Sequence, residues 1–272
     1  MEQAAVVELV DSHCHLDQPH FDADRERVIA RAAKSGVTRL INPGVDLPSS
    51  RAAVALARQH EGIYAAVGVH PHDAKTLDAA ALVELKALAQ ADKSVAMGEI
   101  GLDYYRDLSP RDVQRRAFQM QLELAAELGL PVIVHDRDAH KDVLAMLSDW
   151  RSLLDAQRST LNGKACVLHS FSGDVALAEQ AVALGFYIGI SGPVTYKNAD
   201  QTREVARAVP LGQLLIETDA PYLTPQPYRG KRNEPAYVLL VAQTVADARG
   251  LTLEQVAAQT SANAAALFGL TG

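Results

Sequence analysis

The feature that most constrains the fold is a short apolar run that recurs about every thirty residues. Eight such runs are present, they are rich in Val and Ile, and a segment with helical character follows each one. Runs of this kind are typical of parallel strands that are buried on both faces. They span Val6–Val10, Thr38–Ile41, Tyr64–Val69, Val95–Glu99, Val132–His135, Ala165–Leu168, Phe186–Ile190 and Leu214–Glu217.

Helix signals occupy the segments between the runs. Ser109 and Pro110 predict a helix N-terminus with the serine as its cap, and Gly129 predicts that this helix ends at Leu128. Two further helices are expected after the eighth run, over Pro235–Ala248 and Leu253–Phe268. Eight β-α units in a chain of 272 residues favour one α/β domain, a TIM barrel over residues 1–272. A doubly wound sheet is the alternative.

Composition narrows the class of protein. The chain has 48% hydrophobic residues, which is enough to form one large core. Its net charge of −7 argues against an extended nucleic-acid-binding surface. It could still grip a strand end in a local pocket. Two cysteines are too few for a disulfide framework, and the N-terminus lacks a basic region typical of a signal peptide. We therefore expect a cytoplasmic protein with no membrane segment and no obligate protein partner.

Ionisable residues stand where the predicted strands end. In a barrel the carboxyl ends of all strands meet on one face, which carries the chemistry. Side chains alternate along a strand, so His13 and His15 should share a side and Cys14 should point away. One such histidine could be a core residue, but the whole set is improbable as an accident. The candidate ligands are His13, His15, Glu99, His135, His169 and Asp219.

Six ligands exceed what one tetrahedral ion needs, so the set predicts two divalent ions with a shared carboxylate. We expect Glu99 to be the bridge. His13, His15 and Asp219 would complete one ion site, and His135 and His169 the other. Imidazole-rich ligation favours Zn²⁺, while the carboxylates and a phosphodiester substrate also accept Mn²⁺ or Mg²⁺. Glu217, two residues before Asp219, is expected to orient a ligand rather than to be one. Cys14 and Cys166 are expected to be structural.

The motifs around these residues form a recognisable set. In chain order they are H-C-H-L-D, G-E-I-G-L-D-Y-Y, P-V-I-V-H-D-R-D-A, L-H-S-F-S-G, E-T-D-A-P-Y-L and R-G-K-R-N-E-P. Together they resemble the TatD family of metal-dependent deoxyribonucleases, over essentially the whole chain from Asp11 onwards. One departure is Ala266, where the family often has Arg before Leu-Phe, and it concerns only helix packing.

The resemblance implies a TIM barrel related to the amidohydrolases. It also implies a divalent-metal phosphodiesterase that removes nucleotides from DNA, typically from the 3′ end of a single strand. The family's metal ligands fall on the same six residues. A metal-activated water would attack phosphorus, with Glu99 between the ions and Asp219 as the candidate for accepting the proton. Asp219 could instead act as a ligand alone.

Groups that hold the substrate should come from loops on the same face. His70 is suited to a phosphate, whereas His72 is expected to face solvent. Aromatic and basic residues after Glu99 and His135 could stack on a base and pair with a phosphate. The densest basic cluster lies near the C-terminus and could equally be a solvated loop. The candidate substrate contacts are His70, Tyr105, Arg106, Arg137, Arg229, Lys231 and Arg232.

Two other functions fit the same pattern. A hydrolase of an ester or C–N bond, such as a D-aminoacyl-tRNA deacylase, would use the same metal chemistry. Amidohydrolases commonly bridge their metals with a carboxylated Lys, and no Lys ends any of the eight runs. A barrel that binds metal without catalysis is the third possibility. The full set of six ligands argues against it.

Overall fold

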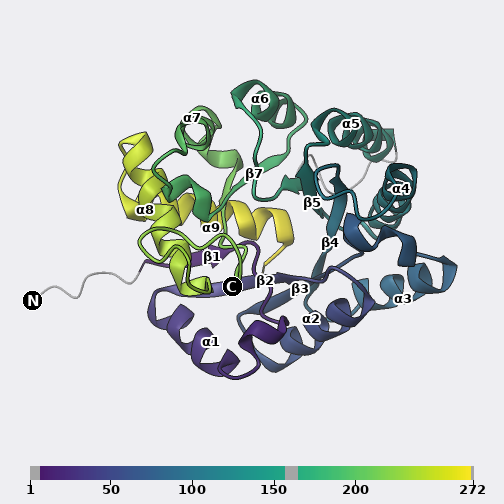
Figure 1. Cartoon of the computed structure of the whole chain (residues 1–272), viewed down its shortest axis with the longest axis horizontal. Coiled ribbons are helices and arrows are strands. Elements are labelled where there is room, and N and C mark those ends of the chain that lie inside the picture. Colours follow the sequence, from purple (N-terminus) through teal and green to yellow (C-terminus); the bar gives the residue numbers. More distant parts are fainter. Residues whose placement is uncertain (1–6, 157–164, 271–272) are drawn as a thin grey trace, which may run out of the picture.

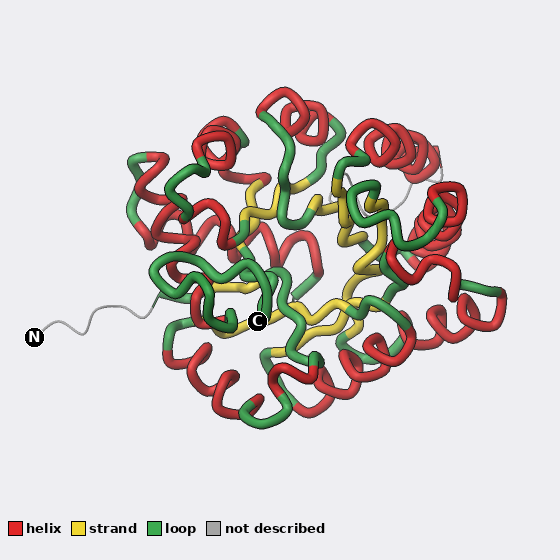
Figure 2. Tube along the Cα trace, in the orientation of Figure 1, coloured by secondary structure: helices red, strands yellow, loops and turns green. Residues whose placement is uncertain are grey.

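Eight parallel strands form one sheet in the order β1 to β8, each paired with the next along the chain. The structure is a computed structural model that describes residues 7–156 and 165–270. The strands are β1 (Leu9–Asp11), β2 (Val37–Pro43), β3 (Ile63–Val67), β4 (Ser94–Asp103), β5 (Val132–Arg137), β6 (Cys166–Leu168), β7 (Tyr187–Ile190) and β8 (Leu214–Ile216). Figure 2 shows them as a ring with the helices around it. The predicted α/β barrel is confirmed.

Helices follow the strands, and all of those described except the last cover the outside of the ring (Figure 1). They are α1 (Arg25–Lys34), α2 (Leu47–Gln59), α3 (Ala79–Ala89), α4 (Arg111–Leu128), α5 (His140–Ala156), α6 (Val175–Ala183), α7 (Asp200–Ala208), α8 (Val238–Arg249) and α9 (Leu253–Phe268). None of the helices in the described part of the chain is both long and apolar enough to span a bilayer.

Contacts between the segments that follow β1 and β8 bring the two ends of the sheet together. The backbone N–H of Ser12 donates to the carbonyl of Ile216 at 3.2 Å, and that of Asp219 donates to the carbonyl of His13 at 2.8 Å. The backbone N–H of His15 donates to the carbonyl of Ala220 at 2.7 Å. These bonds draw the residues after β1 against those after β8, and three of the predicted ligands, His13, His15 and Asp219, lie there.

Two apolar clusters stabilise the barrel. The larger one packs the strands against the surrounding helices and includes Cys14 and Cys166, which are buried and free, in agreement with a structural role. The smaller one fills the barrel interior with one residue from each strand, together with side chains of α9. Its members are Val10, Ile41, Ala66, Ala96, Ile133, Val167, Tyr187, Leu215, Ala264, Leu267, Phe268 and Leu270. In Figure 1, α9 lies across the ring of strands.

Several element boundaries differ from those predicted. β4 continues past Glu99 to Asp103, because its far end still pairs with β5. The predicted first strand began at Val6, which lies outside the described residues. α4 ends at Leu128 with Gly129 in the left-handed region, as predicted, but Ser109 does not cap it. The Ser109 hydroxyl donates to the carbonyl of His72 instead, at 2.8 Å.

The predicted helix from Pro235 to Ala248 is divided into two parts. A short 3₁₀ turn covers Pro235–Tyr237, and α8 then runs from Val238 to Arg249. α9 has the predicted bounds, and its N-terminus is a capping box in which Thr252 and Gln255 satisfy each other's backbone N–H groups. Local capping chemistry is therefore sufficient to place this helix, which closes the barrel interior.

Candidate metal centre

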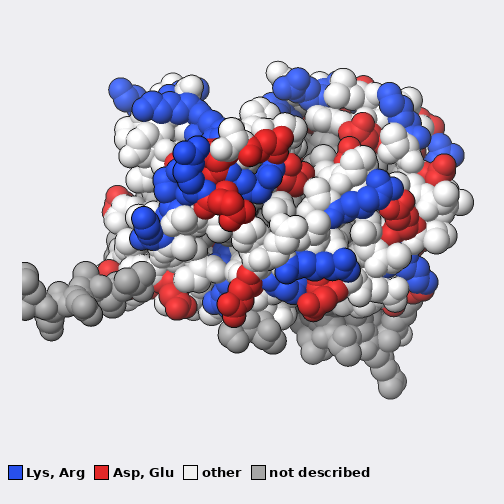
Figure 3. Space-filling model, turned by 90° about the horizontal axis from the view of Figure 1, so that it is seen from below, with Lys and Arg blue, Asp and Glu red and all other residues white. Residues whose placement is uncertain are grey.

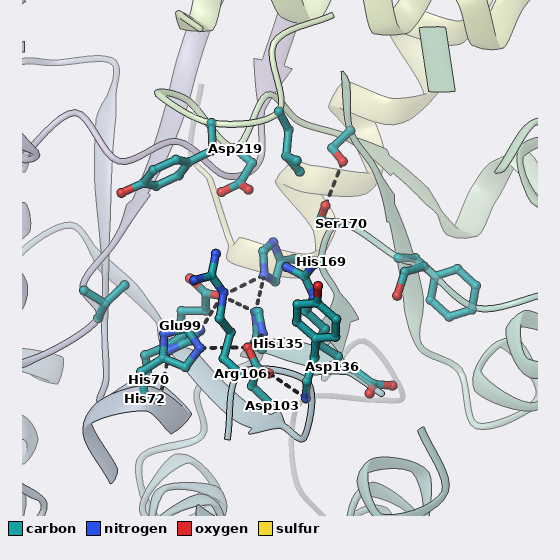
Figure 4. A pocket seen from close by; sticks show the side chains of 18 of the residues that line it. His70, His72, Glu99, Asp103, Arg106, His135, Asp136, His169, Ser170 and Asp219 are labelled. Atoms are coloured by element: carbon teal, nitrogen blue, oxygen red, sulfur yellow. Dashed lines mark hydrogen bonds and ion pairs between the residues drawn. The ribbon is translucent and has the colours of Figure 1, made fainter. Parts of the chain in front are cut away.

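Six side chains meet at the carboxyl end of the barrel, and they are the six predicted as ligands. His13 and His15 follow β1, Glu99 and His135 lie in β4 and β5, and His169 and Asp219 follow β6 and β8. Figure 4 shows four of them around one opening: Glu99, His135, His169 and Asp219. Four of the six are buried, whereas the side chains of Asp219 and His135 are 14% and 18% exposed.

The first ligand cluster consists of His13, His15 and Asp219. The Nε2 atoms of the two histidines lie 3.1 Å apart. The Asp219 Oδ1 atom lies 3.7 Å from the Nε2 of His13 and 3.5 Å from that of His15. Three donor atoms within 4.8 Å of one another can surround one metal ion.

The second ligand cluster consists of Glu99, His135 and His169. One carboxylate oxygen of Glu99, Oε1, lies 2.8 Å from the Nδ1 of His135 and 2.8 Å from the Nε2 of His169. The other oxygen, Oε2, lies 3.4 Å from the Nε2 of His13 and 3.6 Å from that of His15. Glu99 thus presents one oxygen to each cluster, as a bridging carboxylate would.

A change of phase in β4 turns Glu99 inwards. Ala96 faces the barrel interior, whereas Met97, Ile100 and Leu102 pack in the outer cluster. The pairing of β4 with β5 shifts register between Met97 and Ile100, so Glu99 faces the interior three residues after Ala96. Strict alternation would have placed it outside.

Two backbone features bring further ligands into place. Asp219 has a φ of +56°, a left-handed conformation that aspartate tolerates better than most residues and that is concentrated at functional sites. Gly101 has a φ of +142°, and a Cβ there would lie 2.0 Å from the carbonyl oxygen of His135. The absence of a side chain at Gly101 therefore lets β5, with its histidine, lie close against β4.

The hydrogen bonds of His15 test whether the first cluster fits a cation. Its Nδ1 lies 3.1 Å from the carbonyl oxygen of Pro43, which can only accept a hydrogen bond. In the neutral ring the proton is then on Nδ1, and the Nε2 lone pair points at His13 and Asp219. Lone pairs and a carboxylate that face one another without protons between them fit a metal ion.

The charges of the cluster agree with this fit. Burial raises the pKa of Glu99, but the imidazoles around it outweigh burial and hold the pKa well below its ordinary value. Burial lowers the pKa of His15, yet its hydrogen bond to Asp219 and the nearby acids raise the pKa to about 9. Without an ion, protons on histidine neutralise the carboxylates, and a divalent cation would replace those protons.

His70 lies beside Glu99 but differs from the ligands in its tautomer. Its Nδ1 accepts the backbone N–H of His72 at 3.2 Å, so the neutral ring carries its proton on Nε2. That nitrogen lies 3.5 Å from Glu99 Oε1. Burial, followed by the charge of His135, lowers the pKa of His70 to about 4. At neutral pH, His70 is an uncharged hydrogen-bond donor on the edge of the second cluster.

A profile for TatD-related DNases matches residues 10–269, nearly the entire chain. The chain belongs to the TatD family. Its fold is that of TatD proteins, and an engineered lactonase with organophosphate hydrolysis activity shares the barrel fold at 15% identity and a TM-score of 0.65. The paired clusters are consistent with the binuclear site of such hydrolases.

Relatives of this TatD-family chain carry two kinds of name. An uncharacterised metal-dependent hydrolase, YabD of Bacillus subtilis, is 41% identical over 96% of this chain and 98% of its own length. A 3′-5′ ssDNA/RNA exonuclease, TatD of Cronobacter sakazakii, is 40% identical over 96% of this chain and 97% of its own. The crystal structure of YjjV, a TatD homologue from Escherichia coli, covers 98% of this chain and 100% of its own with a TM-score of 0.89 at 32% identity.

A cavity of about 980 Å³ opens above the two clusters. Four of the predicted substrate contacts line it: His70, Tyr105, Arg106 and Arg137. The Arg137 guanidinium lies over the Tyr105 ring, 4.3 Å from its centre, and Tyr105 is 61% exposed. Figure 4 shows Arg106 projecting into the cavity. The TatD-family cavity therefore presents an aromatic face and two cations above its ligands.

The C-terminal basic cluster takes a different position. Arg229, Lys231 and Arg232 are not among the cavity-lining residues. Arg232 donates to both carboxylate oxygens of Asp24, at 2.7 and 2.9 Å, and lies over the Phe21 ring. Arg229 lies over the ring of Tyr196. Arg232 thus anchors its loop to the start of α1, and a role for the cluster in substrate binding stays a prediction.

Glu217 is buried behind the second cluster. Its Oε1 lies 3.6 Å from the Nδ1 of His169 and accepts the backbone N–H of Ser170. Its Oε2 accepts from the Ser12 hydroxyl at 3.2 Å. The carboxylate faces the side of the His169 ring opposite to Glu99, which is the position of a group that orients a ligand.

Sequence reasoning missed Asp103 and misplaced His72. His72 is half-buried rather than solvent-facing, because its Nε2 lies 2.7 Å from Asp103 Oδ2. The same Asp103 oxygen lies 3.3 Å from the Nε2 of His135. Asp103 stands four residues after Glu99 in a strand that was expected to end at Glu99. The sequence did contain a signal for Asp103. Ile100, Gly101 and Leu102 precede it, and a carboxylate at the end of such an apolar segment needs a polar partner if it is buried.

Proposed function

We propose that this chain is a divalent-metal-dependent nuclease that removes nucleotides from the 3′ ends of single-stranded DNA. The observation that carries the proposal is that Glu99 belongs to the second ligand cluster and also faces the first, at the floor of a cavity whose wall presents Arg106, Arg137 and Tyr105. Two cations near a phosphodiester, with an aromatic face for a base, suit a nucleic acid end. Exonuclease relatives at 40% identity support the same substrate class.

The surface also favours an end over a long duplex. On the face seen in Figure 3, Lys and Arg side chains alternate with Asp and Glu. The net charge of −7 adds no general attraction for phosphates. Recognition would therefore depend on the cavity, where Arg106 and Arg137 are concentrated, rather than on an extended basic track.

The six predicted ligands, His13, His15, Glu99, His135, His169 and Asp219, would hold two ions, for which Zn²⁺, Mn²⁺ and Mg²⁺ all suit the donors. When bound, such ions lower the pKa of a water and neutralise charge on the phosphate oxygens. The protein's own groups then complete the reaction.

Asp219 would accept the proton of the attacking water. Burial raises its pKa, but the hydrogen bond from His15 and the nearby imidazoles outweigh burial, and the net pKa is lowered. Its carboxylate is thus ionised at neutral pH, at the edge of the cavity. His70 would donate its Nε2 proton in a hydrogen bond to a phosphate oxygen, and Arg106 and Arg137 would hold the neighbouring phosphate.

The test is an end-labelled nuclease assay on metal-stripped protein reconstituted with Mg²⁺, Mn²⁺ or Zn²⁺. A single-stranded oligonucleotide labelled at its 3′ end should release labelled mononucleotide first, and a 5′-labelled one should give a ladder of shortened products. Asp219→Asn is the control and should abolish both patterns. Hydrolysis of D-aminoacyl-tRNA with no cleavage of DNA would replace the proposal with an ester hydrolase. Ion binding without hydrolysis of either would leave a binding protein.

A further inference from the structure

The Asp103 carboxylate joins the metal centre to the loop that lines the cavity. Asp103 is the last residue of β4 and is 1% exposed. Its Oδ1 accepts the backbone N–H groups of Tyr105 at 3.0 Å and Arg106 at 2.7 Å. Its Oδ2 faces the Nε2 atoms of His72 at 2.7 Å and His135 at 3.3 Å. One buried carboxylate therefore serves four donors, two on each oxygen.

The backbone of Asp103 is held as firmly as its side chain. Gln114 of α4, which is fully buried, accepts the Asp103 N–H with its Oε1 at 2.9 Å. Its Nε2 donates to the Asp103 carbonyl at 3.1 Å. The carboxylate is thus fixed relative to both β4 and α4. Its hydrogen bonds therefore also fix the positions of the side chains and backbone groups that it binds.

The contact on Oδ2 decides which nitrogen of His135 is a ligand. A carboxylate only accepts hydrogen bonds, so in the metal-free ring both the Nε2 that faces Asp103 and the Nδ1 that faces Glu99 Oε1 at 2.8 Å carry a proton. An ion beside Glu99 would replace the proton on Nδ1, while Asp103 keeps the proton on Nε2, so Nδ1 would be the ligand. The contacts on Oδ1 fix the turn from which Tyr105 and Arg106 reach the cavity.

We propose that Asp103 is a positioning residue with two separable roles: Oδ2 holds His135 in the tautomer that ligates the second ion, and Oδ1 holds the loop that carries Tyr105 and Arg106. Neither role requires the substrate to be DNA. Only the consequence that the loop places a base and a phosphate rests on the proposed function.

Two substitutions separate the roles. Backbone N–H groups can only donate, so in Asp103→Asn the amide oxygen must stay with the N–H groups of Tyr105 and Arg106. The amide NH₂ then faces His72 and His135, whose ring nitrogens can accept a hydrogen bond instead of donating one. His135 must then accept at Nε2 and carry its proton on Nδ1, where the ion should bind. Asp103→Ala removes both oxygens and so should affect the tautomer and the loop together.

Ion titration by calorimetry with Mn²⁺ or Zn²⁺ measures the first role, and amide hydrogen exchange at Tyr105 and Arg106 measures the second. Asp103→Asn should weaken the second ion by about tenfold or more, leave the first ion unchanged and keep both amides protected. Asp103→Ala should weaken the second ion and also expose the two amides. Nitrogen-15 NMR of the metal-free Asn variant should show the His135 proton on Nδ1.

The control is Asp142→Asn. Asp142 lies in α5 and does not line the cavity. Its carboxylate accepts a hydrogen bond from the Tyr104 hydroxyl at 2.6 Å. It should leave both ions and both amides unchanged. Two ions bound with wild-type affinity by Asp103→Asn would overturn the tautomer role, and protected amides in a folded Asp103→Ala would overturn the loop role. Because neither readout uses oligonucleotide, a failed nuclease assay and a failed Asp103 prediction are distinguishable.

Discussion

The interior of the barrel has two halves built on the same eight strands. In one half, a residue from each strand and the side chains of α9 form an apolar layer, with Ala96, Ile133 and Leu215 among them. In the other, only two to four residues further along the same strands, Glu99, His135 and Asp219 replace that layer with ionisable groups. The two halves share a scaffold but are stabilised by different forces.

The difference shows where stability and chemistry are separated in this protein. The apolar half removes hydrocarbon from water and stabilises the fold without any ligand. The ionisable half buries carboxylates and imidazoles that satisfy one another only partly, and the Nδ1 atoms of His13 and His169 lack a hydrogen-bond partner among the described residues. Such a site would gain its full stability from a bound cation. Substitutions in the two halves should therefore have different signatures.

The largest expected effect is on activity, in Glu99→Gln. The amide keeps the shape of Glu99 but removes the charge that faces both clusters, so hydrolysis should fall by roughly 10³-fold and the second ion should be lost. The fold should persist, since the apolar half is untouched. Turnover, ion stoichiometry and circular dichroism measure this. Glu127→Gln, an exposed partner of Lys86, is the control. Full turnover with two ions bound would refute the bridging role.

In the apolar half, Phe268→Ala should act on stability and leave ion binding unchanged. Phe268 is 4% exposed, and truncation would leave a cavity between α9 and the strands. We expect the free energy of unfolding of the metal-free protein to fall by about 3 kcal/mol. Denaturant unfolding measures it, with the 72%-exposed Val83→Ala as a nearly neutral reference. If ions were lost while the unfolding midpoint stayed at the wild-type value, the separation between the halves would be wrong.

Gly101→Ala should connect the halves, because the new Cβ would meet the His135 carbonyl at 2.0 Å. The displaced strand should cost about 2 kcal/mol of stability and weaken the second ion at the same time. Gly129→Ala is a matched control, since Gly129 also has a positive φ, +66°, but nothing lies within 4 Å of its Cβ position. It should reduce stability by about 1 to 2 kcal/mol through its left-handed backbone alone, without changing ion affinity. Equal ion affinities in both variants would mean that β4 and β5 can separate freely.

The smallest effect is expected outside both halves, at Asp24. The hydrogen bond from Arg232, followed by that from Arg31, lowers the pKa of Asp24 to about 2. A lowered pKa stabilises the fold above the ordinary value of 3.8, and this contribution is lost as pH falls towards 2. Asp24→Asn should therefore cost less than about 1 kcal/mol at pH 7 and nothing near pH 2. Urea unfolding at the two pH values checks it, and a pH-independent difference would contradict the ion pair.

Much of the fold could be predicted because its signals are local. Parallel strands buried on both faces leave apolar runs, and α9 is a continuous helical stretch of sequence, so the strands and the bounds of α9 were both predicted. The six candidate ligands could be chosen because strand ends converge in a barrel, and the structure brings their side chains together. The Glu99 position could not be derived from alternation, since the register shift beside Met97 depends on how β4 pairs with β5.

The rest depended on contacts between distant segments. Asp103 and its partners His72 and His135 are 31 and 32 residues apart in sequence, and no spacing rule joins them. For the same reason Arg232 looked like a free cation, although Asp24, 208 residues away, holds it with two hydrogen bonds. Charge in a sequence shows what a residue can bind, but only the fold shows which partner has already bound it.

The position of α9 limits the paths by which ions and ligands can enter and leave the barrel. Because its side chains fill the amino end of the ring, ions, substrate and product must pass through the same mouth, above Glu99. An oligonucleotide seated in that mouth would stand in the way of a departing ion. A chelator should then strip the protein more slowly while the nucleic acid is bound, and each round of release should reopen the exit.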